Sequence, residues 1–311
     1  MFSPADLATL PFDDWVNAFV RGWLVPNFRP AFRAAQVPIS MVLDWLDALL
    51  NWLPMLVTTA LFAGAAWKTA GRGMAIFTLV GFAFIDMIGL WPETMTTLAM
   101  IVTSVLFCAV IGIPAGILAA RSDLFWRIVR PILDVMQTIP SFVYLVPIVM
   151  LFGVGMAPGI IATIVFALPP IVRLTNLGIR NVRADLIEAA DAFGSTGWQT
   201  LWDVQLPLAM RTIMAGLNQT LMLSLSMVVI AALIGAGGLG LTVNTGLGRM
   251  DVGQATAGGA AIVILAIVLD RITQGLAEQN GVRRVSLRQT LTNFLRLRGG
   301  DAAPVEAPKA G

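Results

Sequence analysis

The chain has 311 residues, of which 57% are hydrophobic and only 12% are charged, and its formal net charge is +2. Soluble domains carry about 25% charged residues, so this composition excludes an ordinary soluble protein and indicates several membrane-spanning helices. The sequence contains no histidine and a single cysteine, Cys108. It therefore excludes histidine-based catalysis, a histidine metal site and a disulfide framework within the chain, and no catalytic or metal-binding residue is expected.

Residues 1–53 are expected to form an extracytoplasmic segment. Within it, Ile39–Leu53 repeats apolar residues at helical spacing and predicts an amphipathic helix. Asp44 and Asp47 near its middle argue against a membrane crossing. Packing on the rest of the protein and contact with the lipid surface are equally compatible with this pattern.

Residues 54–279 are predicted to be an all-α, polytopic membrane domain with about seven transmembrane helices, because apolar runs recur at lengths near the ~20 residues that cross a bilayer. The spans are expected at residues 54–67, 74–91, 94–120, 131–153, 158–174, 213–236 and 255–269.

Basic residues indicate the orientation of these spans. They gather after the first, third, fifth and seventh spans, whereas the intervening loops contain almost none. By the positive-inside rule, the basic side is cytoplasmic, so the N-terminus is expected outside and the C-terminus inside. A crossing by Ile39–Leu53 would give eight spans and reverse the N-terminus. The basic tail, residues 280–311, is expected on the inner membrane surface with a disordered end.

Polar side chains inside two spans are candidates for lining a passage, because burying them in lipid is costly. In the fourth span they recur at i, i+3, i+4 and i+7, which is one helical face. An alternative for the first of them, Asp134, is an ion pair with Arg127 or Arg130. Interhelical hydrogen bonding is the alternative in the sixth span. The candidates are Asp134, Gln137, Thr138, Ser141, Asn218 and Gln219.

The polar stretch Asp185–Pro207 lies between the fifth and sixth spans and is too long for a simple turn. It predicts a helix from Asp185 to Phe193, with Asp185 as N-cap and Glu188 completing a capping-box-like pair. A break at residues 194–197 follows, and a second helix is expected from residue 198 to residue 206, ending at Pro207.

This stretch resembles the "EAA" loop of ABC-importer permeases: Glu-Ala-Ala, three residues, Gly, nine residues, Ile, any residue, Leu-Pro. Every spacing holds, and valine replaces isoleucine. The matching residues are Glu188, Ala189, Ala190, Gly194, Val204, Leu206 and Pro207. Residues 227–240 and 248–274 look like the glycine betaine/proline betaine, or ProW-like, branch. The resemblance implies a type I importer permease fold and a coupling role for the loop. It also implies an outer gate at Gly235, Gly237, Gly238 and Gly240.

The resemblance further implies uptake of a compatible solute such as a betaine, choline or trimethylamine N-oxide, by a homodimer in a bacterial inner membrane. Partners would be an ABC ATPase subunit, which would hold ATP and magnesium, and an extracytoplasmic substrate-binding protein; no nucleic acid is expected. This chain has no phosphate-binding loop of its own. An amino-acid permease, an ion-driven secondary transporter and a membrane scaffold or enzyme stay open as alternatives.

Overall fold

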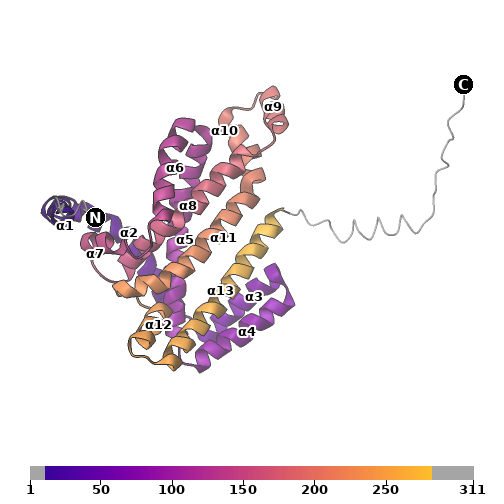
Figure 1. Cartoon of the computed structure of the whole chain (residues 1–311). Helices are drawn as coiled ribbons and strands as arrows, with labels where there is room; N and C mark the ends of the chain where they lie inside the picture. Colours follow the sequence, from indigo (N-terminus) through magenta and orange to yellow (C-terminus); the bar gives the residue numbers. More distant parts are fainter. Residues whose placement is uncertain (1–10, 282–311) are drawn as a thin grey trace, which may run out of the picture.

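The computed structural model of the chain describes residues 11–281, and over that range the elements are helices joined by turns. The central helix is α8, Met156–Arg180. It packs along its length against α5, Trp91–Arg121, and against α11, Leu206–Ala231 (Figure 1). These three long apolar helices form the core of the membrane domain.

Small residues let these helices approach closely. A Cβ added at Gly112 of α5 would lie 2.4 Å from Cγ2 of Ile171 on α8, and one at Gly116 would lie 2.5 Å from Cβ of Thr175. Between membrane helices, attraction comes from close packing and interhelical hydrogen bonds rather than from the hydrophobic effect. Such a hydrogen bond joins α11 to α8, where Thr220 Oγ1 donates to the carbonyl of Ala167 at 3.0 Å.

The expected amphipathic helix lies within a longer one, α2, Val25–Trp52. Ile39 and Leu43 are buried in the same apolar core as α8, while Trp45 and Trp52 are exposed. The apolar face of this segment therefore packs on the protein. A short helix α1, Phe12–Asn17, and a π-helical segment, Ala18–Leu24, precede α2.

The number of membrane crossings stays a prediction. Four described helices are long and apolar enough to cross: Trp91–Arg121, Met156–Arg180, Gly197–Ile234 and Val252–Ala277. A pair of helices, Pro30–Trp52 and Met55–Ala70, is bent by 105° and would count as a fifth crossing. The first two predicted spans are the 16-residue helices α3, Met55–Ala70, and α4, Arg72–Met87, which fall short of the length that usually crosses a bilayer.

The predicted span at residues 131–153 is wrong as a continuous helix. It consists of α6, Asp123–Thr138, and α7, Leu145–Phe152, separated by a turn. α6 ends just before Pro140, since the residue preceding a proline is pushed out of the helical region, and Ile139 is extended.

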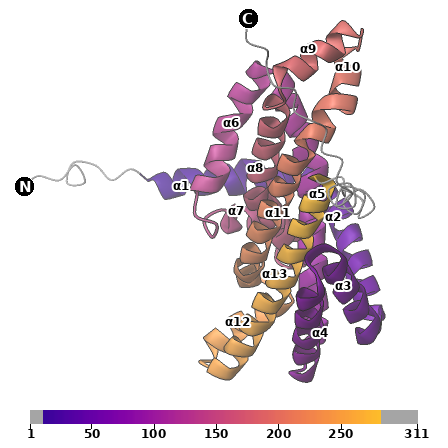
Figure 2. The ribbon, with the colours of Figure 1, turned by 90° about the vertical axis from the view of Figure 1, so that its right-hand side faces the viewer.

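The chain closes through α9, Ala184–Ala192, α10, Gly197–Gln199, the π-helical segment Thr200–Gln205, the short turn Ala232–Ile234, α12, Leu239–Gly248, and α13, Val252–Gly281. α9 and α10 protrude at one end of the molecule, and α12 lies at the other (Figure 1). Figure 2 shows α6 and α12 on one side of α8 and α11, with α3 and α4 on the opposite side. The basic tail from residue 282 onward lies outside the described residues.

Candidate functional site

The first half of the protruding loop is α9, as expected, but its start differs from the prediction. The N-cap is Arg183, and no side chain caps the helix. Asp185 instead lies in the first turn and pairs with Arg183, whose Nη2 is 2.6 Å from Asp185 Oδ2. Asp185 therefore contributes as a negative charge near the positive helix end, and Glu188 lies too far along the helix to complete a capping box.

Gly194 ends α9 with a specific hydrogen-bonded turn. Its φ is +80°, its N–H donates to the carbonyl of Asp191 at 2.9 Å, and the N–H of Ser195 donates to the carbonyl of Ala190 at 3.1 Å. This pair of bonds is the Schellman motif, whose C′ position favours glycine because a side chain is strained at positive φ. The predicted break at residues 194–197 thus begins with a turn at Gly194, and the geometry of this turn explains the residue type.

The second helix of the loop begins with a capping box. The N–H of Thr196 donates to Gln199 Oε1 at 2.8 Å, and the N–H of Gln199 donates to Thr196 Oγ1 at 3.4 Å. The prediction that this helix stops at Pro207 is wrong, because the chain continues through Thr200–Gln205 directly into α11. Pro207 lies in the first turn of α11, where a missing N–H is tolerated.

The loop presents apolar side chains to solvent. Phe193 is 92% exposed and Trp198 is 60% exposed. Glu188 and Ala189 are also exposed, and no hydrogen bond or ion pair joins the side chain of Glu188 to another described residue. Leu206 is buried in the core around α8. Of the remaining motif residues, Ala190 and Val204 are half-buried, and Gly194 and Pro207 are exposed. Because the loop protrudes from the bundle (Figure 2), these side chains are free to meet another protein.

One contact that the sequence did not predict ties this loop to the core helices. Arg121 ends α5, donates to the carbonyl of Gly197, and lies over the ring of Trp198 with its guanidinium carbon 5.3 Å from the ring centroid. Close by, Nη2 of Arg180 donates to the carbonyl of Ala119 at 2.8 Å. The last turns of α5 and α8 are thereby joined to each other and to the loop.

The predicted polar stripe on residues 134–141 is only partly on one helix. Asp134, Gln137 and Thr138 lie on α6, but Ser141 falls in the turn after it. The suggested partners of Asp134 were wrong: Arg173 of α8 donates to it, with Nη2 2.6 Å from Oδ1. The pair is separated by 39 positions in the sequence, so local spacing could not reveal it.

The two candidates on α11 point to different surroundings. Nδ2 of Asn218 donates to Asp270 on α13 at 3.1 Å, and Asn218 Oδ1 accepts from Thr273. Asn218 therefore joins α11 to α13, which agrees with the alternative of interhelical hydrogen bonding rather than with the lining of a passage. Its neighbour Gln219 is exposed.

The glycine segment after α11 forms a tight junction at the α12 end. Gly238 has φ +76°, and a Cβ there would lie 2.4 Å from Thr97 Oγ1. That hydroxyl accepts from the N–H of Leu239 at 2.8 Å. A Cβ at Gly240 would lie 2.6 Å from the carbonyl oxygen of Val228. Gly235 and Gly237 lie next to α8, facing Gly155 and Met156.

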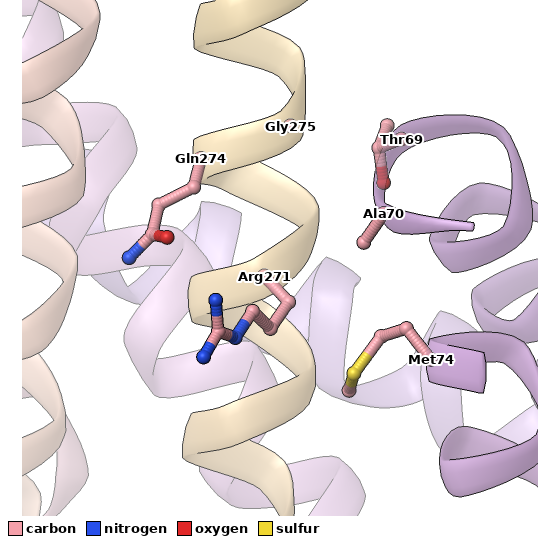
Figure 3. A pocket seen from close by; sticks show the side chains of 6 residues that line it. All are labelled: Thr69, Ala70, Met74, Arg271, Gln274 and Gly275. Carbon is pink, nitrogen blue, oxygen red and sulfur yellow. The ribbon is translucent and has the colours of Figure 1, made fainter.

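A separate pocket of about 360 Å³ lies between the α3–α4 turn and α13. Figure 3 shows Thr69 and Met74 on one side of α13, while the side chain of Gln274 extends from α13 away from them. Nε2 of Gln274 donates a hydrogen bond to Oδ1 of Asp270 at 2.7 Å. None of the predicted site residues lines this pocket.

Comparison with known proteins shows to which family the chain belongs. Residues 112–280 match the family described as "Binding-protein-dependent transport system inner membrane component". The chain is 53% identical to the glycine betaine/proline betaine transport system permease protein ProW of Escherichia coli (strain K12), over 91% of this chain and 80% of that protein. It is 46% identical to the glycine betaine transport system permease protein OpuAB of Bacillus subtilis (strain 168), over 87% of this chain and 95% of that protein.

Among solved structures, an inward-facing MetNI methionine ABC transporter contains a chain of the same fold. The TM-score is 0.54 and the identity 26%, covering 59% of this chain and 92% of that one. The predicted importer permease fold and family are thus confirmed. The chain belongs to the family of binding-protein-dependent transport system inner membrane components.

Proposed function

We propose that this chain is the membrane subunit of an ATP-driven importer for a compatible solute, such as glycine betaine, proline betaine or a related methylated amine. The supporting observation is the loop of α9 and α10. It carries the spacing of an ABC coupling loop, protrudes from the bundle and exposes Phe193 and Trp198. The chain itself catalyses no reaction. ATP and magnesium are held by a separate ATPase subunit, and an extracytoplasmic binding protein delivers the solute.

The loop is the surface on which the ATPase subunit docks. Ala189 leaves the exposed side of α9 without bulk, and Phe193 and Trp198 supply apolar area for a partner. Closure of two ATPase subunits would pull on this loop, and Arg121 would transmit the pull to α5. A ligand shifts a conformational equilibrium only by contacts that differ between the two states, and this loop is where those contacts are made.

The passage is formed by two copies of the chain. Ala215, Gln219, Met222 and Ser226 recur on α11 at helical spacing, and all four are exposed in the single chain. Polar side chains at membrane depth face a protein interior or a water-filled cavity rather than lipid. This stripe therefore faces a second copy, with the passage at the two-fold axis.

The orientation follows the charge distribution. The loop and the C-terminus are cytoplasmic, and the N-terminus is outside the cell membrane. The glycine segment and α12 then lie at the outer side, where they face the binding protein and the entrance of the passage.

Reconstitution in proteoliposomes with the ATPase subunit and the binding protein tests the proposal. Labelled glycine betaine, choline and trimethylamine N-oxide are offered in parallel. Uptake that requires ATP and the binding protein, and that continues in the presence of an uncoupler, is expected. An ion-driven secondary transporter, the rival class, predicts the reverse: uptake that survives ATP depletion and stops with the uncoupler.

A further inference from the structure

A second pocket, of about 420 Å³, lies between α6 and α8. It is lined from α6 by Trp126, Arg130 and Asp134, and from α8 by Arg173, Asn176 and Arg180. Its volume lies within the range of pockets that hold small molecules. α6 lies on the same side of the bundle as α12 (Figure 2), and under the proposed orientation the pocket is at the cytoplasmic end of that side.

The lining contains both positive and negative side chains, and some of their hydrogen-bond donors and acceptors have no partner among the described residues. Arg173 uses Nη2 for Asp134, which leaves its Nε and Nη1 donors and the second carboxylate oxygen of Asp134 without a partner among the described residues. The side chain of Arg130 has no hydrogen bond or ion pair with any other described residue. Arg180 is committed to the surrounding helices through Asn176, Ala119 and Asp123. The pocket therefore presents free guanidinium donors beside a half-used carboxylate.

A tryptophan completes the set. Trp126 is half-buried and lines the same pocket. Aromatic faces attract cations, and methylated ammonium groups are recognised in this way. A guanidinium binds a carboxylate through paired hydrogen bonds. Both halves of a methylated zwitterion thus have a complementary group within one pocket.

We propose that this pocket is a binding subsite for the transported solute at the cytoplasmic end of α6 and α8, an inference that rests on the proposed function. Arg173 and Arg130 bind the carboxylate of a betaine, while Trp126 and Asp134 bind its methylated ammonium group. The resident Arg173–Asp134 pair closes the subsite when it is empty, and a zwitterion replaces that pair with one contact to each partner.

The chemistry favours a zwitterion over a simple anion. A phosphate, whether free or in a lipid headgroup, gains from Arg130 and Arg173 but is repelled by Asp134 and gains nothing from Trp126. A simple ammonium ion gains from Trp126 and Asp134 but is repelled by the arginines, which dominate the lining. A molecule with a carboxylate close to a methylated ammonium group satisfies all four residues.

The test measures equilibrium binding of labelled glycine betaine to the permease–ATPase complex in nanodiscs, without the binding protein. Competitors are tetramethylammonium, acetate and inorganic phosphate, and nanodiscs with and without anionic lipid separate a headgroup from a free ion. Arg173→Gln is expected to weaken betaine binding about tenfold and to leave competition by tetramethylammonium intact. Trp126→Leu is expected to weaken both about fivefold. Arg127→Gln removes the same charge from α6 outside the pocket and serves as the matched control.

The exchange variant Asp134→Arg/Arg173→Asp separates binding from a structural role. It can restore the ion pair, so a pair that only holds α6 to α8 would regain wild-type binding and overturn the proposal. Persistent loss of betaine binding supports it. Phosphate or anionic lipid displacing betaine better than acetate does, or equal binding by wild type and the Arg173 and Trp126 variants, would also overturn it. ATP-driven uptake measured on the same complex reports separately on the proposed function.

Discussion

The glycine that ends α9 provides the sharpest perturbation of the coupling loop. Gly194 has φ +80° and lies in open space, so an added Cβ meets no neighbouring atom within 4 Å. Gly194→Ala therefore changes backbone strain without a steric clash. Placing an L-residue in this left-handed conformation costs roughly 1–2 kcal/mol, which reduces the ratio of ordered to frayed loop by about 5–30-fold.

A matched control lies three residues away. Gly197 also has open space where an added methyl group would lie, but it is helical and is not among the glycines with positive φ. Gly197→Ala should therefore leave the loop ordered. Gly194→Asn should recover part of the loss, because asparagine tolerates the left-handed conformation better than alanine.

Two measurements on reconstituted complexes read out the effect. Hydrogen exchange of the amides of residues 184–196 should accelerate in Gly194→Ala and stay near wild type in Gly197→Ala. The number of solute molecules transported per ATP hydrolysed should fall in the first variant only. Unchanged exchange and unchanged coupling in Gly194→Ala would refute the reasoning that the turn at Gly194 holds the loop in its docking conformation.

Three other substitutions probe contacts that hold the site in place. Arg121→Ala removes the contact with Trp198 and should lower uptake several-fold while ATP hydrolysis continues, with Arg121→Lys restoring charge but not the stacked guanidinium. Thr97→Val leaves the buried N–H of Leu239 unpaired and should cost about 1–3 kcal/mol of stability, measured as a lower unfolding temperature. Asn218→Ala removes the hydrogen bonds between α11 and α13 and should also lower the unfolding temperature.

A neighbouring residue provides the control for Thr97→Val. Thr96→Val removes a half-buried hydroxyl that has no hydrogen bond to another described residue. This variant should not alter the unfolding temperature. If Thr96→Val destabilised as much as Thr97→Val, the junction at Leu239 would not depend on the hydroxyl of Thr97.

The features that were predicted correctly depend on the composition of the chain and on short-range residue spacing. Apolar composition identified an all-helical membrane protein, and the fixed spacing from Glu188 to Pro207 identified the family. The break after α9 at residues 194–197 was also predicted, and glycine after a helix is a common stop signal.

The missed contacts have a tertiary cause, whereas the two errors in helix boundaries have local causes. Arg121 and Gly197 are 76 positions apart, and Asp134 and Arg173 are 39 apart, so no periodicity connects them. Pro207 was misread as a stop because a π-helical segment precedes it and lets the helix accommodate a proline in the first turn of α11. The prediction of a continuous span at residues 131–153 was wrong because the chain breaks at Pro140 and divides this apolar stretch into α6 and α7.

The most direct test of the central claim places a single reactive group on the coupling loop. The native cysteine, Cys108, is buried, so Glu188→Cys gives one accessible thiol on the exposed side of α9. We expect a short bifunctional reagent to join this cysteine to the ATPase subunit, and a membrane-impermeant maleimide added outside intact cells to leave it unlabelled. Labelling from outside, with no adduct to the ATPase subunit, would contradict the account.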